Sequence, residues 1–266
     1  MTTPVALTIA GSDSSGGAGI QADLKTFAAL GVYGASAITA LTAQNTKGVT
    51  GIHPVPAEFV TAQIDAVFSD LDVSAVKIGM VAQRESIDAI VAGLKRWSPK
   101  YVVLDPVMVA TSGDRLLAAE AVEALRTRLI PLASVITPNL PEAAALLDEP
   151  MAISEAEIES QGHRLLALGC RAVLIKGGHG QGIESIDYLV SADGTTALVA
   201  PRVATQNTHG TGCSLSSAVA AGLAKGEDLT NAVSNAKAWI SAAIAAADRF
   251  SVGHGHGPIH HFHRFY

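Results

Sequence analysis

The sequence predicts an α/β fold, a three-layer α/β/α sandwich in which a mostly parallel central sheet carries helices on both faces. Short runs rich in β-branched residues alternate with longer Ala- and Leu-rich segments along the chain, as they do in successive βαβ units. The longer segments often open at Pro, Ser or Asp and close at Gly, which are the residues that favour helix ends. Because parallel strands need crossover connections, this alternation places helices on both faces of the sheet.

Six apolar runs are expected to form the main strands, and two more are expected to form a hairpin near the sheet edge, around the turn Asp193-Gly194. The six strands are predicted at Val5 to Ala10, Ala37 to Leu41, Ala75 to Ile78, Tyr101 to Leu104, Ser134 to Thr137 and Ala172 to Ile175, and the hairpin at Asp187 to Val190 and Ala197 to Val203. Helices are predicted at Gly19 to Leu30, Ala57 to Asp70, Arg84 to Trp97, Ala118 to Leu129, Glu155 to Leu168, Gly212 to Ala224 and Leu229 to Arg249. No linker or internal repeat interrupts the pattern, so residues 1–266 are expected to form a single domain.

Composition and charge exclude several classes of protein. Hydrophobic residues make up 48% of the chain and charged residues 16%, which excludes a disordered or coiled-coil protein. The formal net charge of -6 provides no global basic field, so neither a nucleic acid nor a membrane surface is expected as a partner. The two cysteines, Cys170 and Cys213, are too few for a disulfide framework, and the N-terminus lacks a signal peptide pattern. A cytoplasmic protein is therefore expected.

The first glycine-rich loop follows the first predicted strand. Gly17 to Ala22 matches the dinucleotide-binding pattern GxGxxA, but no Asp or Glu occurs from Thr26 to Ala57, where that fingerprint requires an acidic group for the ribose. At Gly11 the loop instead allows a ligand to approach the backbone closely. It also places an acidic side chain, Asp23, one turn into the next helix. A tight turn with Asp13 as an N-cap-type residue is the structural alternative.

A second glycine-rich loop, Asn207 to Cys213, precedes a predicted helix of small residues. The first N–H groups of a helix lack intrahelical partners and its N-terminus carries partial positive charge, so such a loop can hold a phosphate. The same field is expected to lower the pKa of Cys213 and to allow it to act as a base or nucleophile. Cys170 has no such setting and is expected to be a buried structural residue.

Eight motifs in order along the chain resemble those of one kinase family. They are GSDSSGGAGIQAD at Gly11 to Asp23, TALTAQNT at Thr39 to Thr46, KIGM at Lys77 to Met80, VVLDPVM at Val102 to Met108, TPNLPEA at Thr137 to Ala143, KGGH at Lys176 to His179, NTHGTGC at Asn207 to Cys213 and GHGPIHHFH at Gly255 to His263. The sequence resembles the hydroxymethylpyrimidine and phosphomethylpyrimidine kinases of thiamine biosynthesis, in the ribokinase-like superfamily. The resemblance implies a ribokinase-like form of the predicted fold, the cofactors ATP and Mg²⁺, and a homodimer.

The resemblance implies that the loop Gly210, Thr211, Gly212 and Cys213 is the anion hole for the transferring phosphoryl group. Most sugar kinases of the superfamily carry Asp where this chain has Cys213. A thiol or thiolate is therefore expected to deprotonate the substrate hydroxymethyl group. The second acceptor is a phosphate that is already ionised, so the second transfer is expected to need no base.

The resemblance also implies roles at the nucleotide end. Asn139 and Glu142 match the superfamily motif NxxE, whose Glu organises Mg²⁺, usually through water. An N-cap Asn with a Glu that compensates the helix dipole is the structural alternative. Asp105 is the second carboxylate expected near the metal, with a capping role as its alternative. Lys176 is expected to contact the nucleotide phosphates, with Thr208 as a neighbouring donor.

For the pyrimidine, Gln44 is the most informative residue. A primary amide accepts from an exocyclic amine and donates to a ring nitrogen, which matches an aminopyrimidine edge. The resemblance implies that Asp23 and the Gly11 backbone lie near the hydroxymethyl end and that Met80 and Val107 flank the ring. Met80 and Val107 are equally compatible with a role in the core.

The sequence thus favours an ATP-dependent kinase that converts 4-amino-5-hydroxymethyl-2-methylpyrimidine (HMP) to its phosphate and then to its pyrophosphate. A pyridoxal kinase is the nearest alternative, because pyridoxal is a hydroxymethyl heteroaromatic of similar size. A non-catalytic nucleotide sensor is the alternative from another class. The histidine-rich segment Gly253 to Tyr266 is compatible with a metal site by spacing, but it is discounted because no Cys or carboxylate accompanies it. His209 is expected either near phosphate or in loop packing.

Overall fold

The computed structural model describes residues 3–108, 119–178, 182–249 and 251–266. Its described strands form one sheet of nine, in the order β3-β2-β1-β4-β5-β6-β7-β8-β9. The central pairs from β2 to β7 are parallel, whereas β3, β8 and β9 pair antiparallel with their neighbours. The bounds are β1 (Val5–Asp13), β2 (Tyr33–Asn45), β3 (Gly48–Pro54), β4 (Val73–Ile78), β5 (Tyr101–Leu104), β6 (Val135–Ile136), β7 (Ala172–Ile175), β8 (Glu184–Ser191) and β9 (Gly194–Pro201).

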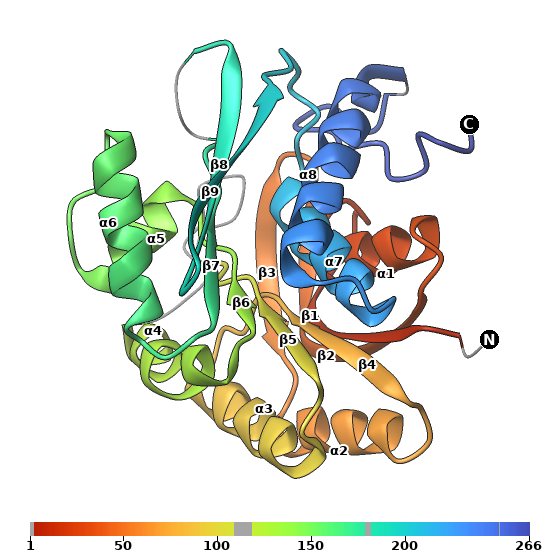
Figure 1. The fold of residues 1–266 in the computed structure, drawn as a ribbon. Helices are drawn as coiled ribbons and strands as arrows, with labels where there is room; N and C mark the ends of the chain where they lie inside the picture. The colour runs from red at the N-terminus through yellow and green to blue at the C-terminus, as the bar shows by residue number, and fades with distance from the viewer. Residues whose placement is uncertain (1–2, 109–118, 179–181, 250) are drawn as a thin grey trace.

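Helices cover both faces of this sheet, and the predicted α/β/α layers are confirmed (Figure 1). The α-helices are α1 (Gly19–Ala29), α2 (Ala57–Phe68), α3 (Arg84–Trp97), α4 (Ala119–Ala124), α5 (Leu140–Leu147), α6 (Glu155–Leu166), α7 (Thr211–Ala224) and α8 (Leu229–Ala245). A π-helical segment (Leu125–Leu129) extends α4, and short 3-10 turns lie at Ile130–Leu132 and Ala247–Arg249. One layer contains α1, α7 and α8, and the other contains the helices from α2 to α6 (Figure 1).

Each layer packs on its own hydrophobic core. One buried cluster joins the sheet to α2, α3, α5 and α6, and includes Ile64, Ile90 and Leu146. The other joins the opposite face to α1, α7 and α8, and includes Phe27, Val219 and Trp239. Because the central strands are buried on both faces, they read as continuous apolar runs in the sequence.

The clearest differences from the sequence prediction are strand β3 and the helix after Ala118, although α5 was also absent from the predicted helices and β2 is longer than predicted. Strand β3 was not predicted, since it contains two glycines and its side chains are mostly exposed. Pairing with β2, rather than burial, holds it in place. The helix predicted at Ala118 to Leu129 changes to π-helical geometry at Leu125, and Ala118 lies outside the described residues.

Candidate active site

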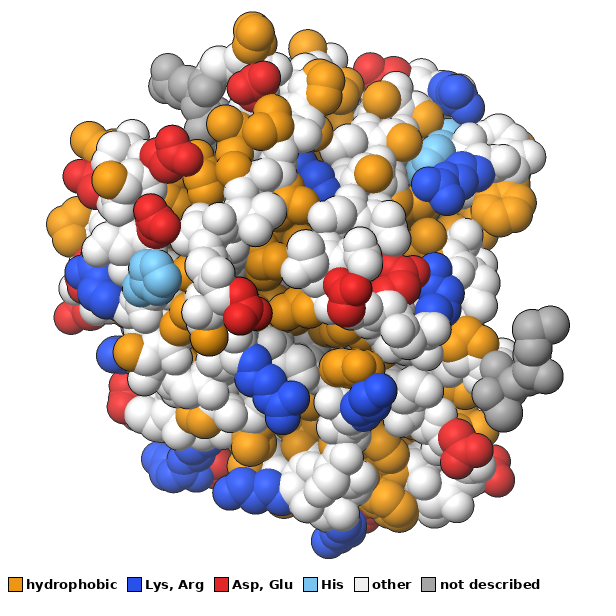
Figure 2. Space-filling view, viewed as in Figure 1, with side chains coloured by type: hydrophobic (Ala, Val, Ile, Leu, Met, Phe, Trp, Pro, Cys, Tyr) orange, Lys and Arg blue, Asp and Glu red, His pale blue; other side chains and the backbone are white. Residues whose placement is uncertain are grey.

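A cavity of about 640 Å³ opens where the carboxyl ends of the parallel strands meet the N-terminus of α7. In α/β folds this edge is where ligands bind, because the loops after the strands face a common crevice. The cavity extends to the β8–β9 hairpin and to α8, whose Lys237 and Ile240 line it. Figure 2 shows hydrophobic side chains in the hollow between the hairpin and α8.

All of the predicted site residues except Asp23 line this cavity. They are Gly11, Gln44, Met80, Asp105, Val107, Asn139, Glu142, Lys176, Thr208, Gly210, Thr211, Gly212 and Cys213. They come from loops that are far apart in the sequence. The structure therefore brings the pyrimidine, phosphate and metal candidates to one place. His179 of the KGGH motif lies outside the described residues.

Asp23, which was expected near the substrate hydroxymethyl group, does not itself line the cavity. Its side chain is fully buried beneath the cavity. It accepts hydrogen bonds from Thr8 Oγ1 at 2.6 Å and Ser217 Oγ at 2.7 Å, and both of its oxygens lie 2.9 Å from Lys77 Nζ. A carboxylate with this many donors has no oxygen free for a substrate, so Asp23 acts on Lys77 instead.

Lys77 is the residue that the sequence analysis overlooked. Its side chain is fully buried, yet it belongs to the lining of the cavity. Burial would lower the pKa of Lys77, but the charges of Asp23, Cys213 and Asp105 raise it overall. The sequence feature that could have revealed Lys77 is a single lysine in the apolar strand VSAVKI. A buried lysine is rarely found without a partner, so such a lysine indicates a buried ion pair.

The expectation that the pKa of Cys213 is lowered is wrong. Burial raises the pKa of Cys213 to about 11, and the negative charges of Asp23 and Asp105 add to the rise. The Lys77 ammonium and the N–H of Gly19 oppose it. Cys213 therefore carries its proton in the free protein at neutral pH. Cys170 is buried as expected, and burial raises its pKa to about 11 as well.

Two glycine loops pack against each other at the start of α7. Gly210 is the N-cap residue and has φ of +80°, a region that favours glycine. A Cβ on Gly210 would lie 1.9 Å from the carbonyl oxygen of Gly17. The loop therefore requires glycine, and it holds the N–H groups of Gly212 and Cys213 at the cavity, in the first turn of the helix.

Charged groups gather at the other side of the α7 N-terminus. Lys176 Nζ lies 2.8 Å from Asp105 Oδ1 and 3.7 Å from Glu142 Oε2. Burial would raise the pKa of Asp105, but Lys176 and Lys77 lower it overall. Burial raises the pKa of Glu142, although Lys176 opposes this. For Lys176 the two carboxylates outweigh burial and hold its pKa above the ordinary value.

Asn139 and Glu142 form a capping box on α5. The Glu142 N–H donates to Asn139 Oδ1, and the Asn139 N–H donates to Glu142 Oε2, both at 2.8 Å. The structural alternative for this pair is thus present. Among the described residues, no three His, Cys, Asp or Glu side chains gather as a metal site.

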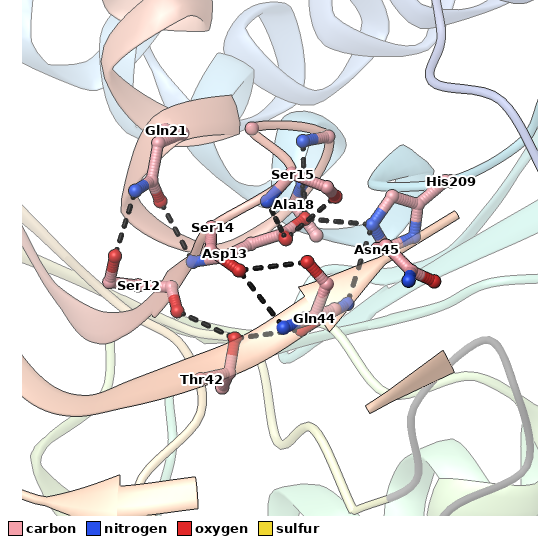
Figure 3. Close-up of polar contacts among 12 residues, drawn as sticks. Ser12, Asp13, Ser14, Ser15, Ala18, Gln21, Thr42, Gln44, Asn45 and His209 are labelled. Atoms are coloured by element: carbon pink, nitrogen blue, oxygen red, sulfur yellow. Dashed lines mark hydrogen bonds and ion pairs between the residues drawn. The ribbon is translucent and has the colours of Figure 1, made fainter. Parts of the chain in front are cut away.

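Of the pyrimidine candidates, Gly11 and Gln44 lie near the ends of β1 and β2, whereas Met80 and Val107 follow β4 and β5. The Met80 methyl group packs over Gly11, where a Cβ would approach it to 2.4 Å. Gln44 and His209 lie beside Asp13 (Figure 3). His209 Nε2 is 2.8 Å from Asp13 Oδ2, so His209 belongs to loop packing rather than to a free phosphate contact.

Another buried ion pair lies where the cavity meets α8 and β8. Lys237 Nζ on α8 is 2.8 Å from Asp187 Oδ2 on β8, and Asp187 Oδ1 accepts the N–H of Gly177. The C-terminal segment packs against α7 and the loop before it, since His261 Nε2 lies 2.9 Å from Ser214 Oγ and the His209 N–H donates to the Gly257 carbonyl. The middle of the histidine-rich tail, residues 257–263, is therefore packed into the fold, whereas His254 and His256 are exposed.

A comparison with known proteins decides the family. The family model for phosphomethylpyrimidine kinase matches residues 13–260. The chain belongs to this family. A hydroxymethylpyrimidine/phosphomethylpyrimidine kinase of Rhizobium meliloti is 61% identical over 264 residues, which are 99% of each chain. The predicted family and its class of enzyme, a phosphotransferase, are confirmed.

Solved structures agree with this family assignment. The crystal structure of a phosphomethylpyrimidine kinase from Clostridium difficile is 48% identical, with a TM-score of 0.80, and the match covers 90% of this chain and 99% of that one. The ADP complex of a pyridoxal kinase from Bacillus subtilis is 37% identical, with a TM-score of 0.92 over the whole of both chains. The fold is thus that of the ribokinase-like vitamin kinases. None of the helices described is long and apolar enough to cross a membrane.

Proposed function

We propose that the chain transfers the γ-phosphoryl group of MgATP to the hydroxymethyl group of HMP, and then a second phosphoryl group to the HMP phosphate. The observation that carries this proposal is a single cavity whose lining includes the Gln44 amide, the Cys213 thiol, the carboxylates of Asp105 and Glu142, and Lys176. Phosphoryl transfer needs alignment and charge neutralisation more than covalent chemistry. The cavity supplies groups for both.

At the acceptor end, the Gln44 amide would pair with the aminopyrimidine edge, and Met80 and Val107 would pack on the ring. Gly11 would allow the ring to approach the backbone. This arrangement also supports the aminopyrimidine over pyridoxal, which lacks an amino group beside a ring nitrogen. A pyridoxal kinase activity remains the second candidate, because a pyridoxal kinase aligns over the whole chain.

At the donor end, the N–H groups of Gly212 and Cys213 would donate to the transferring phosphoryl group, and Thr211 and Gly210 would shape the loop around it. Lys176 would neutralise phosphate charge, with Thr208 as a hydrogen-bond donor beside it. A Cβ on Gly212 would lie 3.3 Å from Lys176 Nζ, so the lysine reaches the same point as the anion loop. The part of the cavity lined by Lys237 and Ile240 of α8 would accept the rest of the nucleotide.

The donor set fits Mg²⁺. Glu142 and Asp105 supply carboxylate oxygens at the cavity, and Asn139 supplies an amide. Mg²⁺ is commonly held by one or two carboxylates together with waters and phosphates, so a larger protein cluster is not required. When bound, the ion would neutralise phosphate charge. Lys176 would then exchange part of its pairing with Asp105 for the nucleotide.

Cys213 would remove the proton of the substrate hydroxyl in the first transfer. With a pKa of about 11 it is protonated in the free protein, so only a small thiolate fraction, on the order of one part in ten thousand at pH 7, is available. Lys77 stabilises that fraction, since its charge opposes the rise of the thiol pKa. In the second transfer the acceptor is an ionised phosphate and needs no such base.

The proposed kinase chemistry is tested by ADP release. The protein with MgATP should release ADP on addition of HMP and again on addition of HMP phosphate, and Glu142→Gln should raise the Mg²⁺ concentration needed for half-maximal release. Arg164→Met, which changes an exposed residue on α6, is the matched control. Binding of nucleotide without release of ADP for either acceptor would contradict the kinase and would support the nucleotide sensor.

The oligomeric state and compartment are part of the same proposal. Tyr33, Leu41 and Ile52 are exposed to 57%, 47% and 39% on the edge formed by β2 and β3, which supports a homodimer joined through this edge. Both cysteines are free thiols, which supports a reducing, cytoplasmic setting. One sheet contains all the described strands, and this supports a single domain.

A further inference from the structure

The tip of the β2–β3 hairpin, residues 43–50, forms part of the acceptor end of the cavity. Gln44 near the end of β2 and Val49 on β3 both line the cavity. In the described sheet β1 pairs with β2 only as far as Thr42, and none of residues 43–50 is fully buried. On one side, Ser14 Oγ donates to the Gln44 carbonyl at 2.8 Å and accepts the Gln44 N–H at 2.9 Å (Figure 3). Hydrogen bonds rather than burial therefore hold this tip.

A segment of the C-terminal tail, Gly253–Gly257, holds the other side of the hairpin tip. We refer to it as the strap. The hydroxyl oxygen of Thr46, in the turn, accepts the N–H groups of His254 at 3.2 Å and Gly255 at 3.1 Å. The carbonyl oxygen of Thr46 accepts the N–H of His256 at 2.9 Å. Thr46 thus receives three N–H groups from one short stretch of backbone.

The same strap also contacts the loop before α7. His256 Nδ1 lies 3.2 Å from the carbonyl oxygen of Gln206, and the Gly257 carbonyl accepts the N–H of His209 at 3.0 Å. His209 directly precedes Gly210, the N-cap residue of α7. One short segment therefore joins the acceptor end of the cavity to the loop proposed to bind the transferring phosphoryl group.

Glycines at alternate positions allow the strap to lie directly against both partners. A Cβ on Gly253, where φ is +74°, would lie 2.3 Å from Thr46 Oγ1, and one on Gly255 would lie 2.1 Å from the Thr46 carbonyl oxygen. A Cβ on Gly257 would lie 2.1 Å from Asn207 Oδ1. Because no side chain fits at these points, the strap backbone needs glycine to approach the hairpin and the loop this closely.

We infer that Thr46 and the strap are positioning elements that fix the acceptor end of the cavity relative to the anion loop, Gly210 to Cys213. Phosphoryl transfer depends on the alignment of the acceptor oxygen with the transferring group. The hairpin tip carries Gln44, and the anion loop carries the N–H groups for the phosphoryl group, so the strap sets how the two lie relative to each other. The inference rests on the proposed role of Gln44 in binding the pyrimidine.

The test measures kcat/KM for HMP at saturating MgATP and, without acceptor, the Kd of the non-hydrolysable analogue AMP-PCP. Thr46→Val removes the hydroxyl oxygen that accepts from the strap but keeps the shape of the side chain and the backbone carbonyl. It should lower kcat/KM for HMP about two- to tenfold, the factor that one hydrogen bond contributes. The Kd of AMP-PCP should change by less than about twofold. Thr46→Ser keeps the oxygen and should restore kcat/KM.

Two matched controls lie on the same hairpin. Thr50 Oγ1 donates to the Ala43 carbonyl at 3.0 Å, within the hairpin itself, so Thr50→Val should leave kcat/KM for HMP unchanged. Gly255→Ala should lower kcat/KM at least as much as Thr46→Val, because the new Cβ displaces the strap from the turn. Gly51→Ala places a Cβ at an ordinary 3.7 Å from that of Ala43 and should leave kcat/KM unchanged.

Hydrogen exchange followed by mass spectrometry shows whether the strap has been released. Thr46→Val should speed exchange at residues 253–257, where two N–H groups lose their acceptor. Faster exchange with unchanged kcat/KM for HMP would overturn the inference, because the strap would then only cover the surface. Unchanged exchange would also overturn it, as would an equal weakening of AMP-PCP binding, which would mean that the strap supports the whole site.

Gln44→Ala separates the inference from the proposal beneath it. A loss of kcat/KM for HMP in Gln44→Ala, with none in Thr46→Val, overturns the positioning role alone. If Gln44→Ala leaves kcat/KM for HMP unchanged, the proposed role of Gln44 fails and the inference fails with it.

Discussion

Replacing Lys77 by methionine should destabilise the protein severely, because it leaves the Asp23 carboxylate buried without its counterion. Both side chains have no exposure to solvent. Removal of one partner of a buried ion pair costs about 3–5 kcal/mol. The hydroxyl groups of Thr8 and Ser217 still donate to Asp23, so the lower half of that range is expected. This is a large part of the ~5–15 kcal/mol that stabilises a typical domain.

The assay is urea denaturation followed by circular dichroism, with the free energy of unfolding extrapolated to water. Lys77→Met should lose several kcal/mol, whereas the double variant Lys77→Met with Asp23→Asn should recover part of the loss, since no charge then remains buried. Arg164→Met removes an exposed ion pair with Glu149 and should cost less than about 1 kcal/mol. A loss in Lys77→Met as small as that of the control, at an unchanged denaturant slope, would refute the reasoning.

Three other predictions concern catalysis, the loop and assembly. Because the thiolate of Cys213 is the active form and its pKa is about 11, kcat/KM for HMP should rise with pH between 7 and 9 by up to about tenfold per unit. Cys213→Ala should flatten this profile and impair the first transfer more than the second, and equal impairment of both would remove Cys213 as a base. Gly210→Ala should abolish activity and lower the melting temperature, because the new Cβ meets the Gly17 carbonyl. Gly226→Ala, which has positive φ but open space around it, should cost only about 1 kcal/mol, and similar losses in the two variants would contradict the clash. Leu41→Lys with Ile52→Lys should convert the proposed dimer to a monomer in light scattering, and an unchanged dimer mass would place the interface elsewhere.

The fold was predictable where burial dominates. The apolar runs at β5 and β7 and the amphipathic pattern of α3 gave the observed bounds to the residue. Strand β3 could not be predicted, because its exposed, glycine-containing segment is determined by hydrogen bonds to β2 rather than by its own pattern. The same reason limited the prediction of β2, whose second half pairs with β3 beyond the apolar run.

The site was predictable where motifs follow strand ends, as at Asp105 and Lys176. The direction of the Cys213 pKa shift was mispredicted, because burial and the charges of Asp23 and Asp105 outweigh Lys77, and the pairing of Asp23 with Lys77 from another strand was not foreseen. Sequence spacing shows that Asp23 lies near a glycine loop. It does not show whether the Asp23 carboxylate pairs with a buried residue of the protein or faces the substrate. Likewise, a helix start predicts a lower thiol pKa, whereas the burial that outweighs it is a property of the packed fold.

The central claim is that this cavity adds two phosphoryl groups in sequence to the aminopyrimidine. The most direct measurement is mass spectrometry of the products formed from MgATP with HMP and, separately, with pyridoxal. The account predicts HMP phosphate first, then HMP pyrophosphate, with little pyridoxal phosphate. Efficient phosphorylation of pyridoxal, with HMP left at one phosphate or none, would contradict it.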